Sequence, residues 1–229
     1  PGSAFKLFVY LAALNAGFKP DDELDDEAIE VDGWRPRNYD GRFRGKVTLR
    51  DAFAHSINTV AVQLTERVGR GQVIAMARRL GMTGQLRPTP SLALGTAETS
   101  LLELTTAYAS VGGGGKVLWP YGIVEIKDRE GNVLYRRKQS FSGRAIEPSV
   151  ANAMDGLLHA VVAQGTGRGA ALPGAAGKTG TTNDNTDAWF VGTTPDLATS
   201  IWVGFDERRI CSGRIGRIGY QHHRCRCFP

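Results

Sequence analysis

Ser3 and Lys6 are the first residues whose types and spacing could do chemistry. They form the pattern S-x-x-K, which on a helix puts a hydroxyl and an amine on one face, one turn apart. Lysine can activate serine as a nucleophile if burial or another cation disfavours the charged amine. Free N–H groups at a helix start would also stabilise an oxyanion beside Ser3. The alternative is structural, with an N-cap serine and a lysine reaching solvent.

Ser56 and Asn58 form a second group, S-x-N. Serine and asparagine are unfavourable inside helices, because their side chains compete for backbone hydrogen bonds. The pair therefore indicates either a functional element or a simple junction between two helices. His55 precedes it, and we interpret this histidine as structural.

A third group, G-K-T-G-T-T, occupies residues 177–182. On a strand, Lys178 and Gly180 would point to one face, and Thr179 and Thr181 to the other. Glycine allows a substrate backbone to approach closely, and lysine beside threonine hydroxyls suits a carboxylate. Alone, K-T-G is short enough to arise by chance.

Helices must position the first two groups. Residues 3–16 are apolar on nearly every side and are followed by Gly17, which predicts a central buried helix. A capping pattern at Thr48 and Asp51 begins a helical region that continues towards residue 68. Further helices are predicted over 72–80, from Ser100 to the glycine run 112–115, and from Pro148 to about residue 162.

Strands are predicted in two parts of the chain, one before and one after the helix that begins at Pro148. Residues 123–127 and 133–137 read as a hairpin, and 177–182, 188–193 and 198–205 as an antiparallel meander. Seven of the ten residues in 21–30 are acidic, which indicates a solvated connection. Helices first and a meander last predict an α+β fold, with helices packed on an antiparallel sheet.

The composition is that of one globular domain. Hydrophobic residues make up 41% and charged residues 22% of the 229, which excludes disordered and fibrous classes. The net charge of +5 could indicate a nucleic-acid partner. However, residues 210–229 contain four arginines and no acid, which leaves only +1 for residues 1–209. We therefore expect no nucleic-acid partner.

The segment 210–229 differs from the rest of the chain. It holds all three cysteines, and Cys225 and Cys227 with the neighbouring histidines match no standard zinc spacing. We expect no metal, and residues 1–209 as the domain with a basic tail outside its fold. No cofactor is expected either, because the glycines of 165–169 follow a helix and lack the last glycine of a dinucleotide loop. The longest apolar run, 7–16, is too short to cross a bilayer.

The order S-x-x-K, S-x-N, K-T-G is the signature of penicillin-binding proteins and class A β-lactamases. The flanking segments include WRPRNYDG, VTLRDAFAHSINTVAVQL, LALGTAETSLLELTTAYAS and GKTGTTNDNTDAWFVGTTP. With them, residues 1 to about 209 resemble the transpeptidase domain of class A penicillin-binding proteins, the bifunctional wall synthases. The resemblance implies a penicillin-binding/β-lactamase-like fold whose first strands, preceding the nucleophile, are missing here. Residues 210–229 resemble nothing in that family.

The resemblance also implies catalytic roles. Ser3 would be the acylated nucleophile and Lys6 the group that takes its proton, although the identity of the base is disputed in this superfamily. Ser56 would relay a proton to the leaving amine, and Lys178 would raise the positive potential and assist Ser56.

The remaining family positions would bind substrate. Asn58 would hold the peptide backbone of the substrate. Thr179 and Thr181 would bind its terminal carboxylate, with Gly180 between them. The backbone N–H groups of Ser3 and Thr181 would form the oxyanion hole.

The function implied is serine D,D-transpeptidation in peptidoglycan synthesis. Its partners would be stem peptides ending in D-Ala-D-Ala, and β-lactams that acylate the serine. The location would be the cell envelope, at the outer face of the bacterial cytoplasmic membrane, with the anchor elsewhere in a longer parent. Two alternatives stay open: a hydrolase of the D,D-carboxypeptidase or β-lactamase type, and a non-catalytic truncated remnant.

Overall fold

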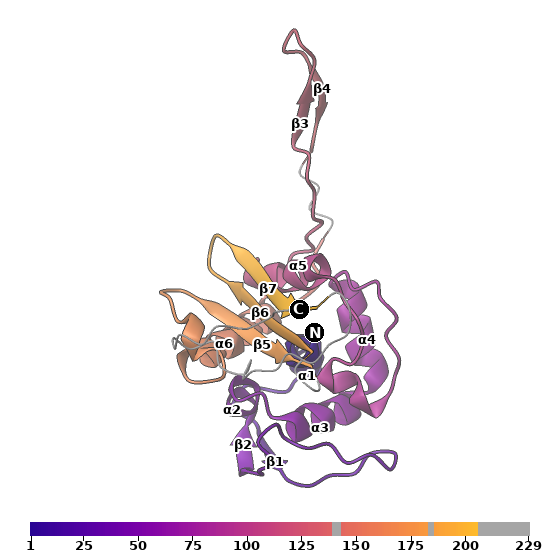
Figure 1. The fold of residues 1–229 in the computed structure, drawn as a ribbon, viewed down its shortest axis with the longest axis vertical. Helices are drawn as coiled ribbons and strands as arrows, with labels where there is room; N and C mark the ends of the chain where they lie inside the picture. Colours follow the sequence, from indigo (N-terminus) through magenta and orange to yellow (C-terminus); the bar gives the residue numbers. More distant parts are fainter. Residues whose placement is uncertain (139–142, 183–185, 206–229) are drawn as a thin grey trace.

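The computed structural model describes residues 1–138, 143–182 and 186–205, so the predicted tail lies outside the described residues. Its first elements are the 3-10 turn η1 (Gly2–Phe5) and helix α1 (Lys6–Asn15). Every residue from Lys6 to Leu14 is buried, and Figure 1 shows α1 enclosed by the other elements. The prediction of a central helix is confirmed, because a helix that is apolar all round must be buried.

The helical region after Thr48 consists of two helices. The Thr48 side chain accepts a hydrogen bond from the backbone N–H of Asp51, which caps α2 (Leu49–Ala54). A break at residues 55–57 separates α2 from α3 (Asn58–Val68). The S-x-N group therefore forms the junction between the two helices, which is one of the two interpretations of its residue types.

The other helices match their predicted starts closely. They are α4 (Arg70–Arg79), α5 (Leu101–Gly112) and α6 (Pro148–Ala163). Two short 3-10 elements, η2 (Pro90–Leu94) and η3 (Arg168–Ala170), were not predicted. Ser100 and Glu103 form a complete capping box at α5. Pro148 occupies the first turn of α6, where its missing N–H costs no hydrogen bond.

The main sheet is the predicted meander of β5 (Ala176–Thr181), β6 (Asp187–Thr193) and β7 (Ala198–Gly204), in that order and antiparallel. Lys178 pairs with Val191, and Trp189 with Trp202. The turn η1 and helices α5 and α6 pack against these strands, so the sheet lies beside α1 as Figure 1 shows. This arrangement brings the third motif group to the first.

A small sheet of β1 (Glu23–Asp26) and β2 (Gly45–Thr48) corrects the interpretation of residues 21–30. The segment is not only a solvated connection, because Leu24 and Asp26 are buried. The number of acidic residues alone did not predict the burial of Asp26, because a carboxylate can be buried where hydrogen-bond donors surround it.

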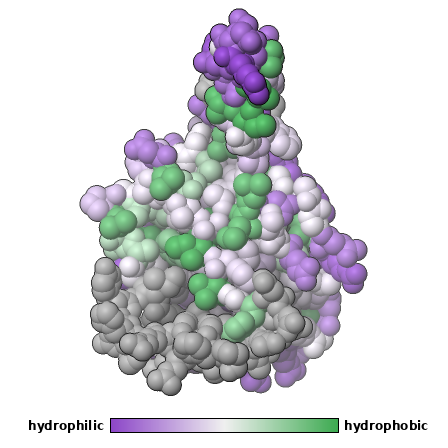
Figure 2. All heavy atoms as spheres, turned by 45° about the horizontal axis from the view of Figure 1, so that its top comes forward, coloured by the Kyte–Doolittle hydropathy of each residue, from purple (hydrophilic) through white to green (hydrophobic). Residues whose placement is uncertain are grey.

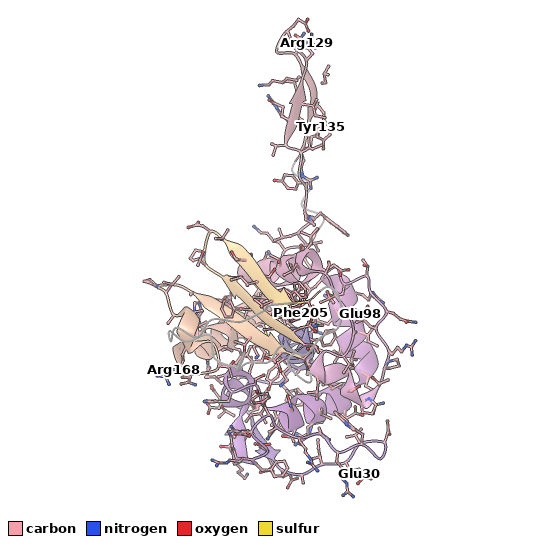
Figure 3. The ribbon with its side chains drawn as sticks, viewed as in Figure 1. Glu30, Glu98, Arg129, Tyr135, Arg168 and Phe205 are labelled. Atoms are coloured by element: carbon pink, nitrogen blue, oxygen red, sulfur yellow. The ribbon has the colours of Figure 1, made fainter. Side chains whose placement is uncertain are left out.

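The predicted hairpin is formed by β3 (Glu125–Lys127) and β4 (Val133–Arg136). It projects from the body of the molecule in Figures 1 and 3, with the labelled Arg129 and Tyr135 on the projecting part. Every residue of β4 is exposed. Figure 2 shows apolar side chains below the polar tip of this arm. Across the described part of the chain, no helix has both the length and the apolar character needed to cross a membrane.

Candidate active site

Lys6 is the centre of the site. Its side chain extends from the first turn of α1 and is fully buried. The Nζ atom lies 2.7 Å from the carbonyl oxygen of Ser56, 3.2 Å from Ser56 Oγ and 2.6 Å from Asn58 Oδ1. The first and second motif groups, 50 residues apart in sequence, therefore meet in space.

Ser56 has an unusual backbone that explains this approach. Its φ of 57° is in the left-handed region, which a non-glycine residue adopts only when its surroundings hold it there. Here the conformation lies at the break between α2 and α3. It directs the carbonyl oxygen and the Oγ atom of Ser56 towards Lys6.

Lys178 approaches Ser56 from the sheet. Its Nζ atom donates to Ser56 Oγ and to the carbonyl oxygen of Thr179, both at 3.0 Å. The side chain is fully buried, and its Nζ atom lies 5.7 Å from the centre of the Phe53 ring. The Ser56 hydroxyl thus lies between two lysine amines, within hydrogen-bonding distance of each.

Burial lowers the pKa of both lysines, and the charge of a neighbouring lysine acts on Lys6 as well. Burial, with a further contribution from the charge of Lys178, lowers the pKa of Lys6 well below its usual value. Burial lowers the pKa of Lys178 to about 7. Within the described part of the chain, neither amine forms an ion pair with a carboxylate. The arrangement therefore favours a neutral Lys6 able to accept a proton.

Ser3 lies in η1, one turn before Lys6, and is partly exposed. The residues around it pack closely on β5. A Cβ atom on Gly180 would lie 2.2 Å from the carbonyl oxygen of Pro1, and one on Gly2 would lie 2.3 Å from that of Thr181. Glycine is required at both positions, and this close contact fixes Ser3 beside the end of β5.

Thr179 and Thr181, near the end of β5, are partly exposed. The Thr179 hydroxyl lies 2.7 Å from the hydroxyl of Thr166. No motif in the sequence predicted a role for Thr166. Gly165 lets this loop reach the site, because a Cβ there would lie 2.1 Å from the carbonyl oxygen of Ala54. Gly165 thus serves close packing beside the site.

Asn58 has both ends of its side-chain amide engaged. Its Oδ1 accepts from Lys6, and its Nδ2 donates to the carbonyl oxygen of Arg37 at 2.8 Å. One N–H of this amide has no partner among the described residues. His55 points away: its ring Nδ1 lies 3.0 Å from the carbonyl oxygen of Asp51, and the residue is exposed. The structural interpretation of His55 agrees with this position.

The chain belongs to the penicillin binding protein transpeptidase domain family, whose sequence pattern matches residues 1–205. Among its curated relatives are penicillin-binding proteins 1A. That of Neisseria meningitidis is 40% identical over 96% of this chain, and that of Rickettsia typhi 36% identical over 90%. The chain spans 29% and 30% of their respective lengths. The predicted resemblance to class A penicillin-binding proteins is confirmed.

Solved structures agree with the predicted fold. Penicillin-binding protein 1A from Haemophilus influenzae superimposes with a TM-score of 0.86 and 28% identity, covering 93% of this chain and 39% of that one. Penicillin-binding protein A from Mycobacterium tuberculosis, solved as an imipenem acyl-enzyme complex, gives 0.81 and 26%, covering 94% and 57%. The α+β transpeptidase fold predicted from the sequence is thereby confirmed.

Proposed function

We propose that this chain is a serine D,D-transpeptidase unit that forms an acyl-enzyme on Ser3. The observation that carries the proposal is the pair of buried lysines on either side of the Ser56 hydroxyl. One of them, Lys6, follows Ser3 by one helical turn. Such a group can accept a proton from the nucleophile and deliver one to the leaving amine.

Acylation uses these residues in turn. Neutral Lys6 accepts the Ser3 proton while Ser3 Oγ bonds to the carbonyl carbon of the penultimate D-alanine. The oxyanion is held by the N–H groups of Ser3 and Thr181, and Asn58 holds the substrate backbone. The C–N bond then breaks, and the terminal D-alanine amine takes a proton through Ser56. An amine of a second stem peptide next attacks the ester and releases Ser3.

The electrostatics of the site suit an anionic substrate. Lys178 is fully buried and has no carboxylate partner among the described residues. When it is protonated, a substrate carboxylate beside Lys178, Thr179 and Thr181 would compensate its charge. Gly180 between the threonines lets the Ser3 turn pack against β5, because a Cβ atom there would meet the carbonyl oxygen of Pro1. Stem peptides ending in D-Ala-D-Ala and β-lactams both supply such a carboxylate. We place the activity at the outer face of the bacterial cytoplasmic membrane.

The carboxylate can be tested directly. Lys178→Ala should slow acylation by a carboxylate-bearing substrate more than acylation by its ester. Equal losses for both would mean that β5 is only structural support.

Labelling with a fluorescent penicillin tests the proposed function as a whole. Wild type should become covalently labelled, and Ser3→Ala should not. Ser149→Ala is the matched control, because Ser149 is also a serine in the first turn of a helix but is exposed on α6. Equal labelling of Ser3→Ala and wild type would refute the proposal.

The hydrolase alternative predicts a different fate for the acyl-enzyme. With a thioester substrate and an added D-amino acid, a transpeptidase passes the acyl group to the amine, whereas a hydrolase releases it to water. The product ratio at increasing amine concentration separates the two.

A further inference from the structure

Asn58 is held by a buried polar network beside the α2–α3 junction, centred on the carboxylate of Asp26. Asp26 is 1% exposed, and it is one of the acidic residues expected to face solvent. Its Oδ1 accepts from Thr59 Oγ1 at 2.5 Å and from Asn38 Nδ2 at 2.7 Å. Its Oδ2 accepts from the backbone N–H of Arg44 at 2.9 Å. A buried carboxylate with this many donors is held firmly in one orientation.

Asn38 links this carboxylate to the start of α3. Its Nδ2 donates to Asp26 and to the carbonyl oxygen of Arg42, while its Oδ1 accepts from the backbone N–H of Asn58 at 2.9 Å. Helix α3 has no side-chain cap from its own N-cap residue, Ile57. Asn38 therefore satisfies N–H groups that a helix start leaves without intrahelical partners.

The same loop holds the Asn58 side chain. The carbonyl oxygen of Arg37 accepts from Asn58 Nδ2 at 2.8 Å, so adjacent loop residues fix the backbone and the side chain of Asn58. The Oδ1 atom of Asn58 is then aimed at Lys6 Nζ, 2.6 Å away. A continuous chain of contacts runs from Asp26 through Asn38 and Asn58 to Lys6.

We propose that Asp26 and Asn38 are positioning residues that set the geometry of Asn58 and Lys6 for acylation. This inference rests on the proposed function. Neither residue contacts the Ser3 turn in any described hydrogen bond. They fix the first residue of α3, Asn58. The position of Asn58 in turn fixes the Oδ1 atom that accepts a hydrogen bond from Lys6.

The first test separates positioning from folding. In Asn38→Ala, the rate constant of penicillin acylation should fall by about 10- to 100-fold, because a small displacement of a reacting group has effects of this size. The final extent of labelling, which counts folded molecules, should stay near that of wild type. Asn132→Ala is the matched control, because Asn132 Nδ2 also donates to an aspartate, Asp128, at 2.8 Å, but on the exposed hairpin.

A reciprocal exchange gives a second test. In Asp26→Asn alone, an amide NH2 group replaces one of the two carboxylate oxygens that accept hydrogen bonds. In Asn38→Asp alone, two carboxylates face each other. Asp26→Asn combined with Asn38→Asp restores a donor facing an acceptor and should recover part of the lost rate. The recovery is partial, because the new carboxylate faces the carbonyl oxygen of Arg42.

The outcomes distinguish the two proposals. If wild type and Asn132→Ala are not labelled, the proposed function fails. If wild type is labelled and Asn38→Ala reacts with an unchanged rate constant, whatever its final extent, the positioning role is refuted. An exchange variant slower than both single variants would also refute it.

Discussion

Two regions of the molecule are built by opposite means: the buried centre around Ser56 and the projecting β3–β4 hairpin. In the centre, Lys6 and Lys178 contact Ser56 across 50 and 122 residues of sequence. In the hairpin, Asp128 and Asn132 are four residues apart, and Glu125 and Arg136 eleven. Lys6 and Lys178 are fully buried, whereas every residue of β4 is exposed. Loss of a polar group should therefore be severe in the centre, where its partner stays buried and unsatisfied, and mild in the hairpin, where water replaces it.

Lys6→Met should produce the largest difference between the two regions. It keeps much of the side-chain volume but removes the amine, so acylation should slow by about 10³-fold, within the range for loss of a general base. Lys127→Met is the control, since Lys127 forms an exposed ion pair with Glu125 on the hairpin. The rate constant of acylation is measured for both variants, Lys6→Met and Lys127→Met. A Lys6→Met enzyme within about 10-fold of wild type would show that Lys6 is not the base.

A pair of leucine substitutions extends the comparison to stability. Leu11→Ala removes a fully buried side chain of α1 and should lower the free energy of unfolding by about 2–5 kcal/mol. Leu134→Ala removes a side chain that is 68% exposed on β4 and should change it by less than about 0.5 kcal/mol. Urea unfolding gives both values. Similar losses would mean that the hairpin is part of the cooperative core.

Lys178 makes the stability of the centre depend on pH above about pH 7. Below pH 7 the amine is protonated in both the folded and unfolded chains. From pH 7 towards 10.5, the unfolded chain retains a proton that the folded chain has lost, because burial lowers the folded pKa to about 7. Stability should therefore rise with pH in this window, by at most about 1.4 kcal/mol per pH unit from this group.

The measurement compares unfolding at pH 7 and pH 9. Lys178→Met should reduce the rise, whereas Lys127→Met should leave it as in wild type. A rise of the same size in Lys178→Met would place the titration on another group.

Much of this comparison could be predicted from the sequence. Local signals at Thr48, Ser100 and Pro148 predicted three helix starts, and the turn at 128–132 predicted the hairpin. The three motif groups predicted the residues that meet at Ser56, because their residue types carry chemistry wherever the chain places them. The buried role of Asp26 could not be predicted, because it depends on donors from Asn38, Arg44 and Thr59 that only the fold brings together.

The smallest effect is expected from residues 210–229. We propose that the transpeptidase unit is contained in residues 1–209, since the composition and the family resemblance both change near that boundary. Removal of 210–229 should leave the unfolding midpoint and the rate of penicillin labelling unchanged. A lower midpoint or a loss of labelling would assign the segment to the fold.

Peptide mapping of the penicillin adduct tests the central claim most directly. Trypsin releases Ser3 in the peptide of residues 1–6, where it is the sole side-chain hydroxyl, and Ser56 in the peptide of residues 51–67. After brief exposure to penicillin, mass spectrometry should find the added mass on the first peptide and not on the second. An adduct on residues 51–67, or one that persists in Ser3→Ala, would contradict the account.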